Sequence, residues 1–222
     1  MKAVVFDLFE TLVTEWGRQK YTTFEISSDL NVEYEKFKRE WDSLRSDRYL
    51  GKMRETIQVY RYILENIGIK RDEELLIRIS QKRDECKRKC FQESEPQILE
   101  MLLSIKEKGY KIGLISNCSA EEIKGFKESK LYPFFDAVVL SCDVGMVKPD
   151  TEIYKLCLSM LNEQPSDCCF IGDGGSNELN GARNVGMLPL RALWFIKHFV
   201  KDFHSDKTYP TLLETTEVMS LM

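Results

Sequence analysis

The side chain with the clearest chemical potential in this 222-residue chain is Asp7, which ends an unbroken apolar run over residues 3–6. Such a run predicts a short strand that is buried on both faces of a parallel sheet. A carboxylate at the end of a buried strand is costly unless a cation or hydrogen-bond donors compensate its charge. In doubly wound folds, ligands bind at the carboxyl ends of the central strands. Asp7 is therefore a candidate functional carboxylate, the alternative being an ordinary half-exposed residue that closes the strand.

Two later strand ends carry side chains that could act on an anion. Ser116 and Asn117 follow the apolar residues 112–115, and a hydroxyl and an amide beside a helix start can hold an anion. Lys148 precedes Pro149, which disfavours helix at the lysine and fixes a turn that can aim the ammonium. Taken singly, each is also typical of a helix cap or a plain turn.

A third strand end is rich in oxygen ligands. The predicted strand ends at Asp173, and the glycine-rich loop after it brings Asn177 and Glu178. Together with Asp7, these side chains form an oxygen-rich set suited to Mg²⁺. A metal there would also compensate the buried charge of Asp7.

The elements that must position these side chains alternate between helix and strand. This alternation predicts βαβ units with right-handed crossovers, and hence an α/β fold with a parallel sheet. A capping box of Ser94 and Gln97 is expected to start one helix, and Ser119 with Glu122 another. The expected strands cover residues 110–116, 137–142, 168–172 and 187–192, and the expected helices end at Gly109, Leu161 and Gly186.

Residues 14–93 show helical periodicity and no convincing strand, so they predict a small helical bundle inserted after the first strand. We expect Asn31 to cap one helix, Gly68 to end a second, and Asp72 to open a third. The third helix carries a basic run at residues 82–89. Such a run is usually a solvated helix face. The alternative is that part of it faces a pocket and attracts an anion.

Composition narrows the class of protein. The net charge of −4 gives the molecule no general attraction to nucleic acid or to an anionic membrane, and the apolar runs are too short to span one. The N-terminus enters the first strand directly, which leaves no room for a signal peptide. Seven cysteines without metal-binding spacing indicate reduced thiols. We expect a cytoplasmic protein that acts on a small molecule, with no nucleic-acid or membrane partner.

The four motifs, in this order, resemble those of the haloacid dehalogenase-like hydrolases. The resemblance covers nearly the whole chain, and it implies a Rossmann-like parallel sheet core, residues 1–13 and 94–222, with an inserted all-helical cap domain, residues 14–93. The matching motifs are residues 6–12, 115–117, 147–154 and 171–187.

The resemblance implies catalytic roles for several side chains. Asp7 would be the nucleophile, which attacks phosphorus or carbon to form an aspartyl ester. Ser116 would hold a phosphoryl oxygen, with Asn117 in the same substrate-binding segment, and Thr11 is a further catalytic candidate. Lys148 would offset the charge of the nucleophile and of the transition state.

The resemblance also implies a Mg²⁺ site. Asp7, the backbone carbonyl of Phe9, and Asp173 would hold the ion, with Asn177 or Glu178 acting through water. A divalent metal and a lysine together cancel the repulsion between a carboxylate nucleophile and a phosphate dianion.

Two residues depart from the family pattern. Most phosphatases of this family carry an acid–base aspartate where this chain has Phe9, whereas the metal-independent dehalogenases carry an aromatic residue there. Those dehalogenases lack the acid that corresponds to Asp173. Phe9 therefore favours a dehalogenase, whereas Asp173 favours a metal-dependent phosphatase. Glu10 stands where a glycine is usual, either as a solvated loop residue or as a substitute acid beside the substrate.

Three functional hypotheses follow. The leading one is a Mg²⁺-dependent phosphatase of small phosphorylated metabolites that forms an aspartyl-phosphate. The second is a metal-independent dehalogenase of 2-haloacids. The third is a weakly active or non-catalytic binder of phosphoryl ligands, because Phe9 removes the residue that would handle the proton.

Overall fold

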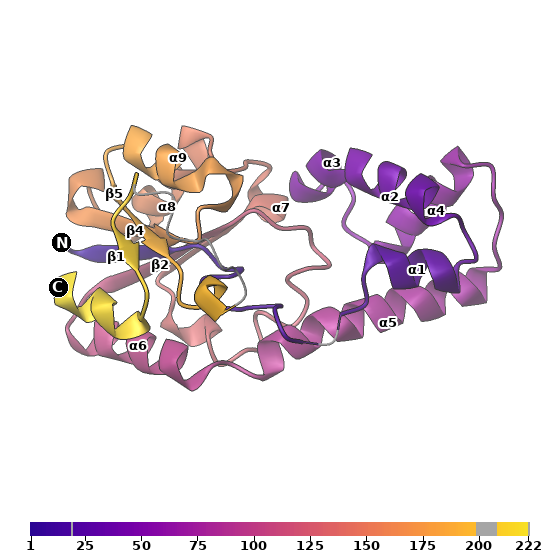
Figure 1. The fold of residues 1–222 in the computed structure, drawn as a ribbon. Coiled ribbons are helices and arrows are strands. Elements are labelled where there is room, and N and C mark those ends of the chain that lie inside the picture. The colour runs from indigo at the N-terminus through magenta and orange to yellow at the C-terminus, as the bar shows by residue number, and fades with distance from the viewer. Residues whose placement is uncertain (19, 199–207, 222) are drawn as a thin grey trace.

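The structure, a computed structural model, describes residues 1–18, 20–198 and 208–221. Its centre is a six-stranded sheet in the order β3-β2-β1-β4-β5-β6, in which every neighbouring pair is parallel (Figure 1). The strands are β1 (Ala3–Phe6), β2 (Lys111–Ser116), β3 (Ala137–Leu140), β4 (Cys168–Gly172), β5 (Leu188–Ala192) and β6 (Thr211–Leu212). The predicted parallel α/β core is thereby confirmed.

Helices cover both faces of this sheet, because successive side chains of a strand point to opposite faces. Val4 and Phe6 of β1 pack in the cluster that α6 (Pro96–Glu107) covers, whereas Ala3 and Val5 pack under α8 (Thr151–Leu161) and α9 (Glu178–Asn184). With all four side chains of β1 fully buried, the strand is the unbroken apolar run that a doubly covered sheet requires.

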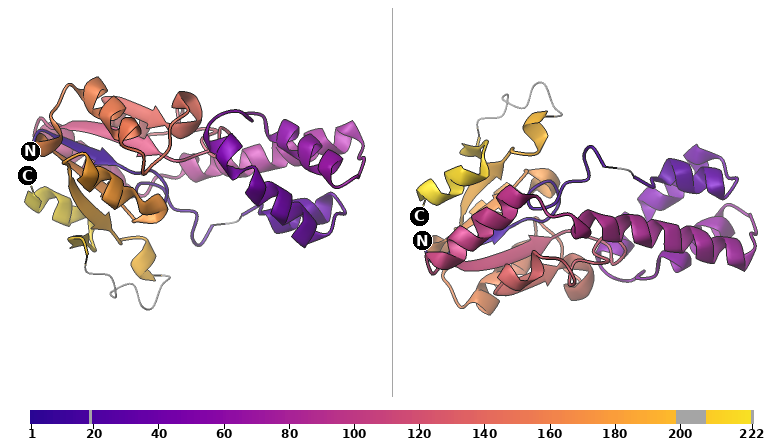
Figure 2. Two further views of the ribbon diagram at one scale, coloured as in Figure 1. Left: turned by 90° about the horizontal axis from the view of Figure 1, so that it is seen from above. Right: turned by 90° about the horizontal axis from the view of Figure 1, so that it is seen from below.

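The helical cap is a separate lobe beside the core (Figure 1). It consists of α1 (Thr23–Asp29), α2 (Tyr34–Ser43), α3 (Arg45–Tyr49), α4 (Thr56–Asn66) and α5 (Glu73–Gln92). Its own apolar cluster contains Phe37, Trp41 and Tyr60. The cap's long helix α5 runs from its far end to the core in both views of Figure 2, and near its end Phe91 is already buried in the core cluster. α5 therefore connects the two lobes mechanically.

Several helix boundaries differ from the sequence-based expectations. Asn31 does not cap a helix: it adopts a left-handed φ of 51° just after α1, and Glu33 precedes α2. Ser94 and Gln97 form no capping box, since Glu95 is the residue that precedes α6. The expected ends at Gly68 and Gly109 are confirmed, and each glycine has a left-handed φ after its helix.

The segment after β2 was expected to be a helix and is not one. The Glu122 carboxylate accepts bonds from the Ser119 N–H at 2.8 Å and from the Ser119 hydroxyl at 3.1 Å, which is one half of a capping box, but residues 120–131 form consecutive turns. The local signal is satisfied without a helix because a side-chain bond across three residues suits a turn as well. Similarly, β3 ends at Leu140, and residues 141–144 form the short helix α7 (Ser141–Val144).

The chain after β5 returns to the core. Trp194 is buried and donates its indole N–H to the carbonyl of Thr11 at 2.8 Å, while the short helix η6 (Thr215–Leu221) buries Val218 beside α6. None of the seven cysteines forms a disulfide bond, as expected. Within the described residues, no helix combines the length and the apolar composition needed to span a membrane.

Candidate active site

Asp7 lies at the carboxyl edge of the sheet because β1 is a central strand. Phe6 is in register with Leu114 of β2 on one side and Ile171 of β4 on the other, and the Asp7 N–H continues the ladder to the Ile171 carbonyl at 2.9 Å. The polar residues that follow β2 and β4 are thus its immediate neighbours. This edge is where ligands bind in open α/β sheets.

Lys148 is the positive charge of the site. Its buried ammonium donates to the carboxylates of Asp7 and Glu178, and the three side chains are each at most 8% exposed. Burial alone would lower the pKa of Lys148, but the attraction of the two carboxylates raises it above its ordinary value. The lysine is therefore charged throughout the physiological pH range.

The negative charges of the site outnumber the positive one. Oxygens of Asp7, Asp173 and Glu178 all lie within 4.8 Å of one another. Burial raises the pKa of Asp7, which Lys148 partly opposes and Asp173 reinforces. Burial and the neighbouring Asp7 raise the pKa of Glu178 to about 8. Three clustered carboxylates with one ammonium leave a deficit of positive charge that a divalent cation would fill.

Glu178 occupies its place because the loop and helix around it are shaped for it. Its carboxylate accepts a bond from the Gly174 N–H at 3.2 Å, and its carbonyl accepts one from the buried Tyr154 hydroxyl at 2.8 Å. A Cβ at Gly172 would overlap the Glu178 carboxylate, so only glycine leaves room at the end of β4. Tyr154 is a positioning residue that sequence reasoning placed only within a motif.

Asn177, the other metal-ligand candidate of this loop, lies differently. It is exposed, has a left-handed φ of 55°, and its side-chain oxygen accepts a bond from Asn180. The acidic cluster therefore contains Glu178, while Asn177 forms the loop in front of α9.

Ser116 presents a buried hydroxyl toward the end of β2. The side chain is 1% exposed, and its oxygen has no hydrogen-bond partner among the described residues. An unpaired buried hydroxyl is costly and rare in a folded protein, and a ligand oxygen would satisfy it. Asn117 instead bonds the backbone of Lys148, and Thr11 lies beside Asp7, with 3.5 Å between its hydroxyl and a carboxylate oxygen.

Phe9 and Glu10 both turn toward neighbouring structure. The Phe9 ring packs edge-on against Phe91 of α5, with 6.4 Å between the ring centroids. Glu10 has a left-handed φ of 56°, which explains why a glycine is usual there. Its carboxylate accepts bonds from the Thr14 hydroxyl and from the Glu15 N–H at 3.1 Å, so it closes its own loop.

Comparison with known proteins agrees with this geometry. The model of one family, described as haloacid dehalogenase-like hydrolase, matches residues 1–186. The chain belongs to the haloacid dehalogenase-like hydrolases. It is thus a hydrolase by family, as the motifs predicted.

Among curated proteins, the chain is 30% identical over 123 residues to the pyrophosphatase PpaX of Bacillus anthracis (strain A0248), a match that covers 52% of this chain and 56% of that protein. The chain thus spans about half the length of the curated relatives it matches.

Solved structures show the same fold at low sequence identity. The HAD family enzyme bt-2542 of Bacteroides thetaiotaomicron, in complex with magnesium and inorganic phosphate, has a TM-score of 0.65 at 19% identity, over 86% of this chain and 94% of that one. A 2-haloacid dehalogenase of Pseudomonas syringae pv. Tomato DC3000 has a TM-score of 0.67 at 18% identity, over 100% and 97%. The fold is therefore common to phosphate-binding and dehalogenating relatives.

Proposed function

We propose that this chain is a Mg²⁺-dependent hydrolase of small phosphorylated metabolites, with Asp7 as the nucleophile. The observation that carries the proposal is the cluster of Asp7, Asp173 and Glu178 around a single lysine. Without a metal, Lys148 alone offsets these carboxylates, and the raised pKa values of Asp7 and Glu178 reflect their burial and the repulsion that remains.

Mg²⁺ fits the donor set, because hard oxygen ligands are what this ion prefers. Asp7, Asp173 and the backbone carbonyl of Phe9 would hold it, with Glu178 or Asn177 behind them. When bound, the ion would supply the positive charge that offsets the repulsion between a carboxylate and a phosphate dianion.

The chain's own residues account for the remaining steps. A carboxylate oxygen of Asp7 attacks phosphorus, the bond from phosphorus to the leaving group breaks, and the aspartyl-phosphate is then hydrolysed by water. Lys148, held charged between two carboxylates, offsets charge on the nucleophile and on the phosphoryl oxygens. The free hydroxyl of Ser116 donates to a phosphoryl oxygen.

Phe9 restricts the substrates that this site can serve. With an apolar ring two positions after the nucleophile, no carboxylic acid there can protonate a departing alkoxide. Acyl, aryl and anhydride phosphates need no such proton, because their leaving groups depart as stable anions. The pyrophosphatase name of the curated relatives supports this preference, since pyrophosphate is an anhydride.

The second candidate is a metal-independent dehalogenase of 2-haloacids, which the aromatic Phe9 favours. The acidic Asp173 beside Asp7 argues against it, because a haloacid carries a carboxylate that this cluster would repel. The third candidate is a weakly active or non-catalytic binder of phosphoryl ligands, which would hold the phosphoryl group with the same residues as the phosphatase.

The deciding experiment measures turnover of acetyl phosphate, 4-nitrophenyl phosphate and 2-chloropropionate. Each substrate is assayed once with about 5 mM MgCl₂ and once with about 5 mM EDTA.

 The phosphatase hypothesis expects turnover of both phosphates that needs the metal, and none of the haloacid. Turnover of 2-chloropropionate that EDTA leaves unchanged would establish the dehalogenase instead. Absence of any turnover, together with binding of inorganic phosphate, would establish the binder.

A further inference from the structure

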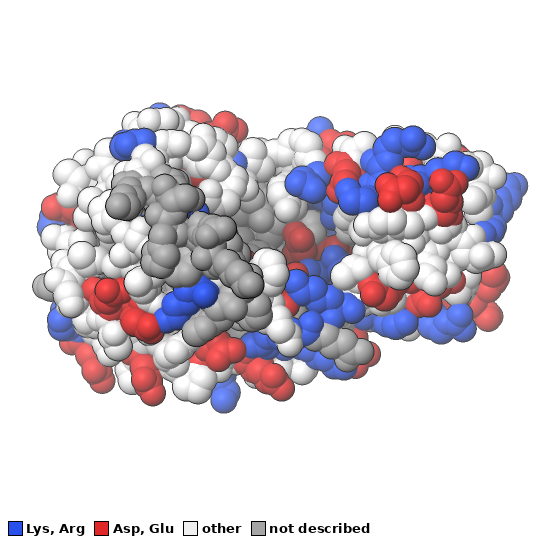
Figure 3. All heavy atoms as spheres, in the orientation of Figure 1, with Lys and Arg blue, Asp and Glu red and all other residues white. Residues whose placement is uncertain are grey.

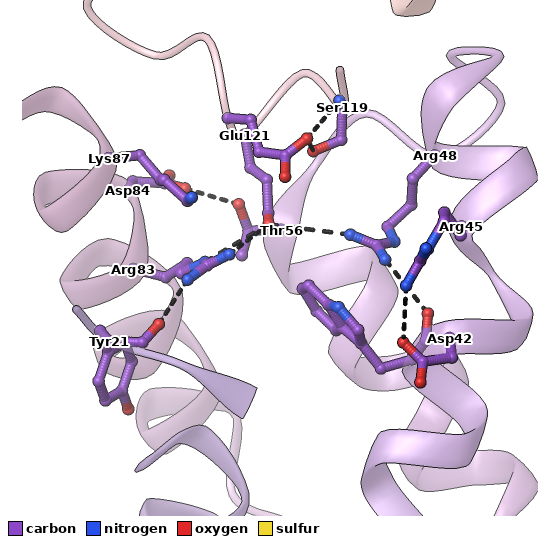
Figure 4. Close-up of polar contacts among 12 residues, drawn as sticks. Tyr21, Asp42, Arg45, Arg48, Thr56, Arg83, Asp84, Lys87, Ser119 and Glu121 are labelled. Carbon is purple, nitrogen blue, oxygen red and sulfur yellow. Dashed lines mark hydrogen bonds and ion pairs between the residues drawn. The ribbon is translucent and has the colours of Figure 1, made fainter. Parts of the chain in front are cut away.

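Glu121 is a buried carboxylate outside the acidic cluster of the candidate active site. It lies in the turns that follow Ser116 and β2, and it is only 2% exposed. Two arginines of the cap face it, Arg83 from α5 and Arg48 from α3 (Figure 4). The Arg83 guanidinium donates to one Glu121 oxygen, at 3.4 Å from Nε and 3.2 Å from Nη2, and Nη1 of Arg48 lies 4.0 Å from the same oxygen. We call Glu121, Arg48 and Arg83 the Glu121 cluster.

The two arginines are also held by the cap itself. Nη2 of Arg48 donates to the Trp41 carbonyl at 3.2 Å, and its guanidinium lies 4.0 Å from the centroid of the Trp41 ring. Arg83 also donates to the carbonyl of Tyr21. Burial would lower the pKa of Arg83, but the Glu121 carboxylate raises it above its ordinary value. The cap therefore presents a preorganised pair of cations to a carboxylate of the core.

Other contacts between the two lobes are charged as well. Lys124, from the same turns as Glu121, donates to Asp84 of α5, which also accepts the hydroxyl of Thr56 at 2.6 Å. Arg54 of the cap donates to Asp143 of α7 at 2.6 Å. Figure 3 shows acidic and basic side chains intermixed where the two lobes meet. Charged partners regain water when two surfaces separate, so this interface holds the lobes less firmly than an apolar one would.

The basic run of α5 is largely used at this interface. Arg83 and Lys87 line a cavity of about 290 Å³ where the lobes meet, and both are already paired, with Glu121 and Glu15 respectively. The buried cations of the run thus bind carboxylates of the protein itself. The remaining cations of the run are exposed, namely Lys82, Arg88 and Lys89.

The Glu121 cluster is not fully hydrogen-bonded. The second carboxylate oxygen of Glu121 and Nε of Arg48 are buried and have no hydrogen-bond partner among the described residues. Water would satisfy both atoms if the lobes moved apart, which makes the docked arrangement only modestly favourable. Removal of one charged partner, by contrast, leaves the others buried without compensation and is costly. Docking of the cap therefore depends on all three charges.

The segment from Ser116 to Glu121 is tied to its neighbours by successive hydrogen bonds. Asn117 bonds the loop of the candidate catalytic lysine in both directions. The Cys118 N–H donates to the Ser141 hydroxyl at 2.9 Å, and that hydroxyl donates to the Cys118 carbonyl at 3.1 Å. A segment bonded in this way moves as a unit, so the positions of Glu121 and Ser116 are linked.

We propose that Glu121 is a positioning residue that couples the cap to the substrate-binding segment. While Arg48 and Arg83 hold Glu121, the cap is docked on the core and the Ser116 hydroxyl is fixed in place for a phosphoryl oxygen. When they release it, the segment loosens. The role given to Ser116 rests on the proposed function, whereas the docking of the cap by the Glu121 cluster does not.

Hydrogen exchange followed by mass spectrometry tests the docking without any turnover. In Glu121→Gln the two guanidinium groups lose their carboxylate, so we expect the amides of residues 117–126 to exchange about tenfold faster, the effect of one lost charge-assisted contact. Peptides from β1 and β4 should keep their wild-type exchange rates, because local opening of the segment leaves the sheet intact. A general loss of stability would instead speed exchange in the sheet as well.

Kinetics with 4-nitrophenyl phosphate test the link to Ser116. Glu121→Gln should lower kcat/KM about tenfold, in step with the change in exchange. The double variant Glu121→Gln with Arg83→Gln removes both members of the closer ion pair. Its effect should therefore be smaller than the product of the two single effects, because neither partner is left charged without the other.

Glu73→Gln is the matched control. It makes the same chemical change in a carboxylate that pairs with Arg61 on the exposed surface of the cap. Both the exchange of residues 117–126 and kcat/KM should stay at their wild-type values. Should Glu121→Gln fail to fold, Glu121→Asp, which keeps the charge and shortens the side chain, gives the same comparison with a smaller effect.

The outcomes separate this inference from the proposed function. Wild-type exchange of residues 117–126 in Glu121→Gln overturns the docking role, whatever the activity. Faster exchange there with unchanged turnover in an active enzyme overturns the link to Ser116. If wild type hydrolyses no phosphate, the phosphatase fails, and faster exchange confined to residues 117–126 still supports docking of the cap through Glu121.

Discussion

Asn117 holds the backbone of Lys148 at two points. The Lys148 N–H donates to the Asn117 side-chain oxygen at 2.7 Å, and the Asn117 amide donates back to the Lys148 carbonyl at 2.8 Å. The residue after Ser116 thereby fixes the loop that carries the ammonium to Asp7. Asn117 was predicted to contact substrate, and its amide has this structural use as well.

Replacing Asn117 by alanine should impair catalysis through the position of Lys148. Loss of both bonds frees the Lys148 backbone, so we expect kcat to fall about 10- to 100-fold, since small displacements of a catalytic group are costly. The free energy of unfolding should fall by about 1–3 kcal/mol, because two buried or half-buried partners lose their bonds. Steady-state kinetics and urea denaturation measure the two effects. Asn117→Asp keeps the acceptor alone and should fall between wild type and alanine; wild-type kcat in Asn117→Ala would contradict this role.

Asp7→Asn should abolish turnover while the protein stays folded. The substitution removes the proposed nucleophile and keeps its shape, and it removes the charge of a carboxyl group whose pKa is raised by burial. Without Mg²⁺, stability should therefore stay level or rise. Thermal denaturation in EDTA and single-turnover assays check the two statements. Steady-state activity near that of wild type would rule out an aspartyl-ester mechanism.

Asp173→Asn should weaken Mg²⁺ binding. The residue is one of three carboxylates whose oxygens lie within 4.8 Å of one another, so its replacement removes a proposed oxygen ligand and one negative charge. We expect the Mg²⁺ concentration for half-maximal activity to rise at least tenfold, or about 1.4 kcal/mol in binding free energy. A titration of activity against MgCl₂ measures it, with calorimetric Mg²⁺ binding as a readout independent of turnover. An unchanged Mg²⁺ requirement would remove Asp173 from the metal site.

Glu178 should make the metal-free protein less stable at high pH. Its folded pKa of about 8 lies above the ordinary 4.5, because of burial and the nearby Asp7. The folded state thus keeps a proton that the unfolded chain has released, so this contribution to stability is fully present below pH 4.5 and is lost as the pH rises through 8.

Urea denaturation in EDTA, at pH values from about 5 to about 9, measures how the free energy of unfolding changes with pH. Glu178→Gln cannot titrate and should show a smaller fall in the free energy of unfolding than wild type. Mg²⁺ should also reduce the fall, because it stabilises the ionised carboxylates. Parallel pH profiles for wild type and Glu178→Gln would contradict the raised pKa.

Phe9→Asp should change substrate preference. General acid–base catalysis contributes about 10²–10⁴-fold, so a carboxylic acid at this position should raise the rate for an alkyl phosphate far more than for 4-nitrophenyl phosphate. The competing effect is loss of the ring that packs on Phe91, which would lower both rates together.

Phe9→Leu is the matched control, since it removes the ring without adding an acid. Measuring an alkyl and an aryl phosphate on the three proteins separates packing from proton transfer. An equal change for both substrates in Phe9→Asp, or a fall in both, means that Phe9 serves packing or dehalogenase-like chemistry, and the phosphatase proposal then fails.

Much of the architecture is readable from local pattern. The apolar run before Asp7, the helical periods and the glycines after helices predict a parallel α/β core with an inserted helical cap, because burial on both faces and left-handed backbone leave strong local signals. The helix predicted after β2 is one place where the local pattern was misleading. Ser119 and Glu122 make their bonds without starting a helix, since a turn satisfies the same side chains.

The order of the motifs in the sequence was sufficient to identify the family and to propose the residues of a candidate site. It could not decide how those residues are arranged, because each pairing joins loops far apart in the chain. Only the tertiary structure shows that Glu178 shares Lys148 with Asp7, that Asn117 fixes the Lys148 backbone, and that Glu10 turns into its own loop. The basic run on α5 is the clearest case: its composition is visible in sequence, but which cations face a cavity depends on how α5 packs against the core.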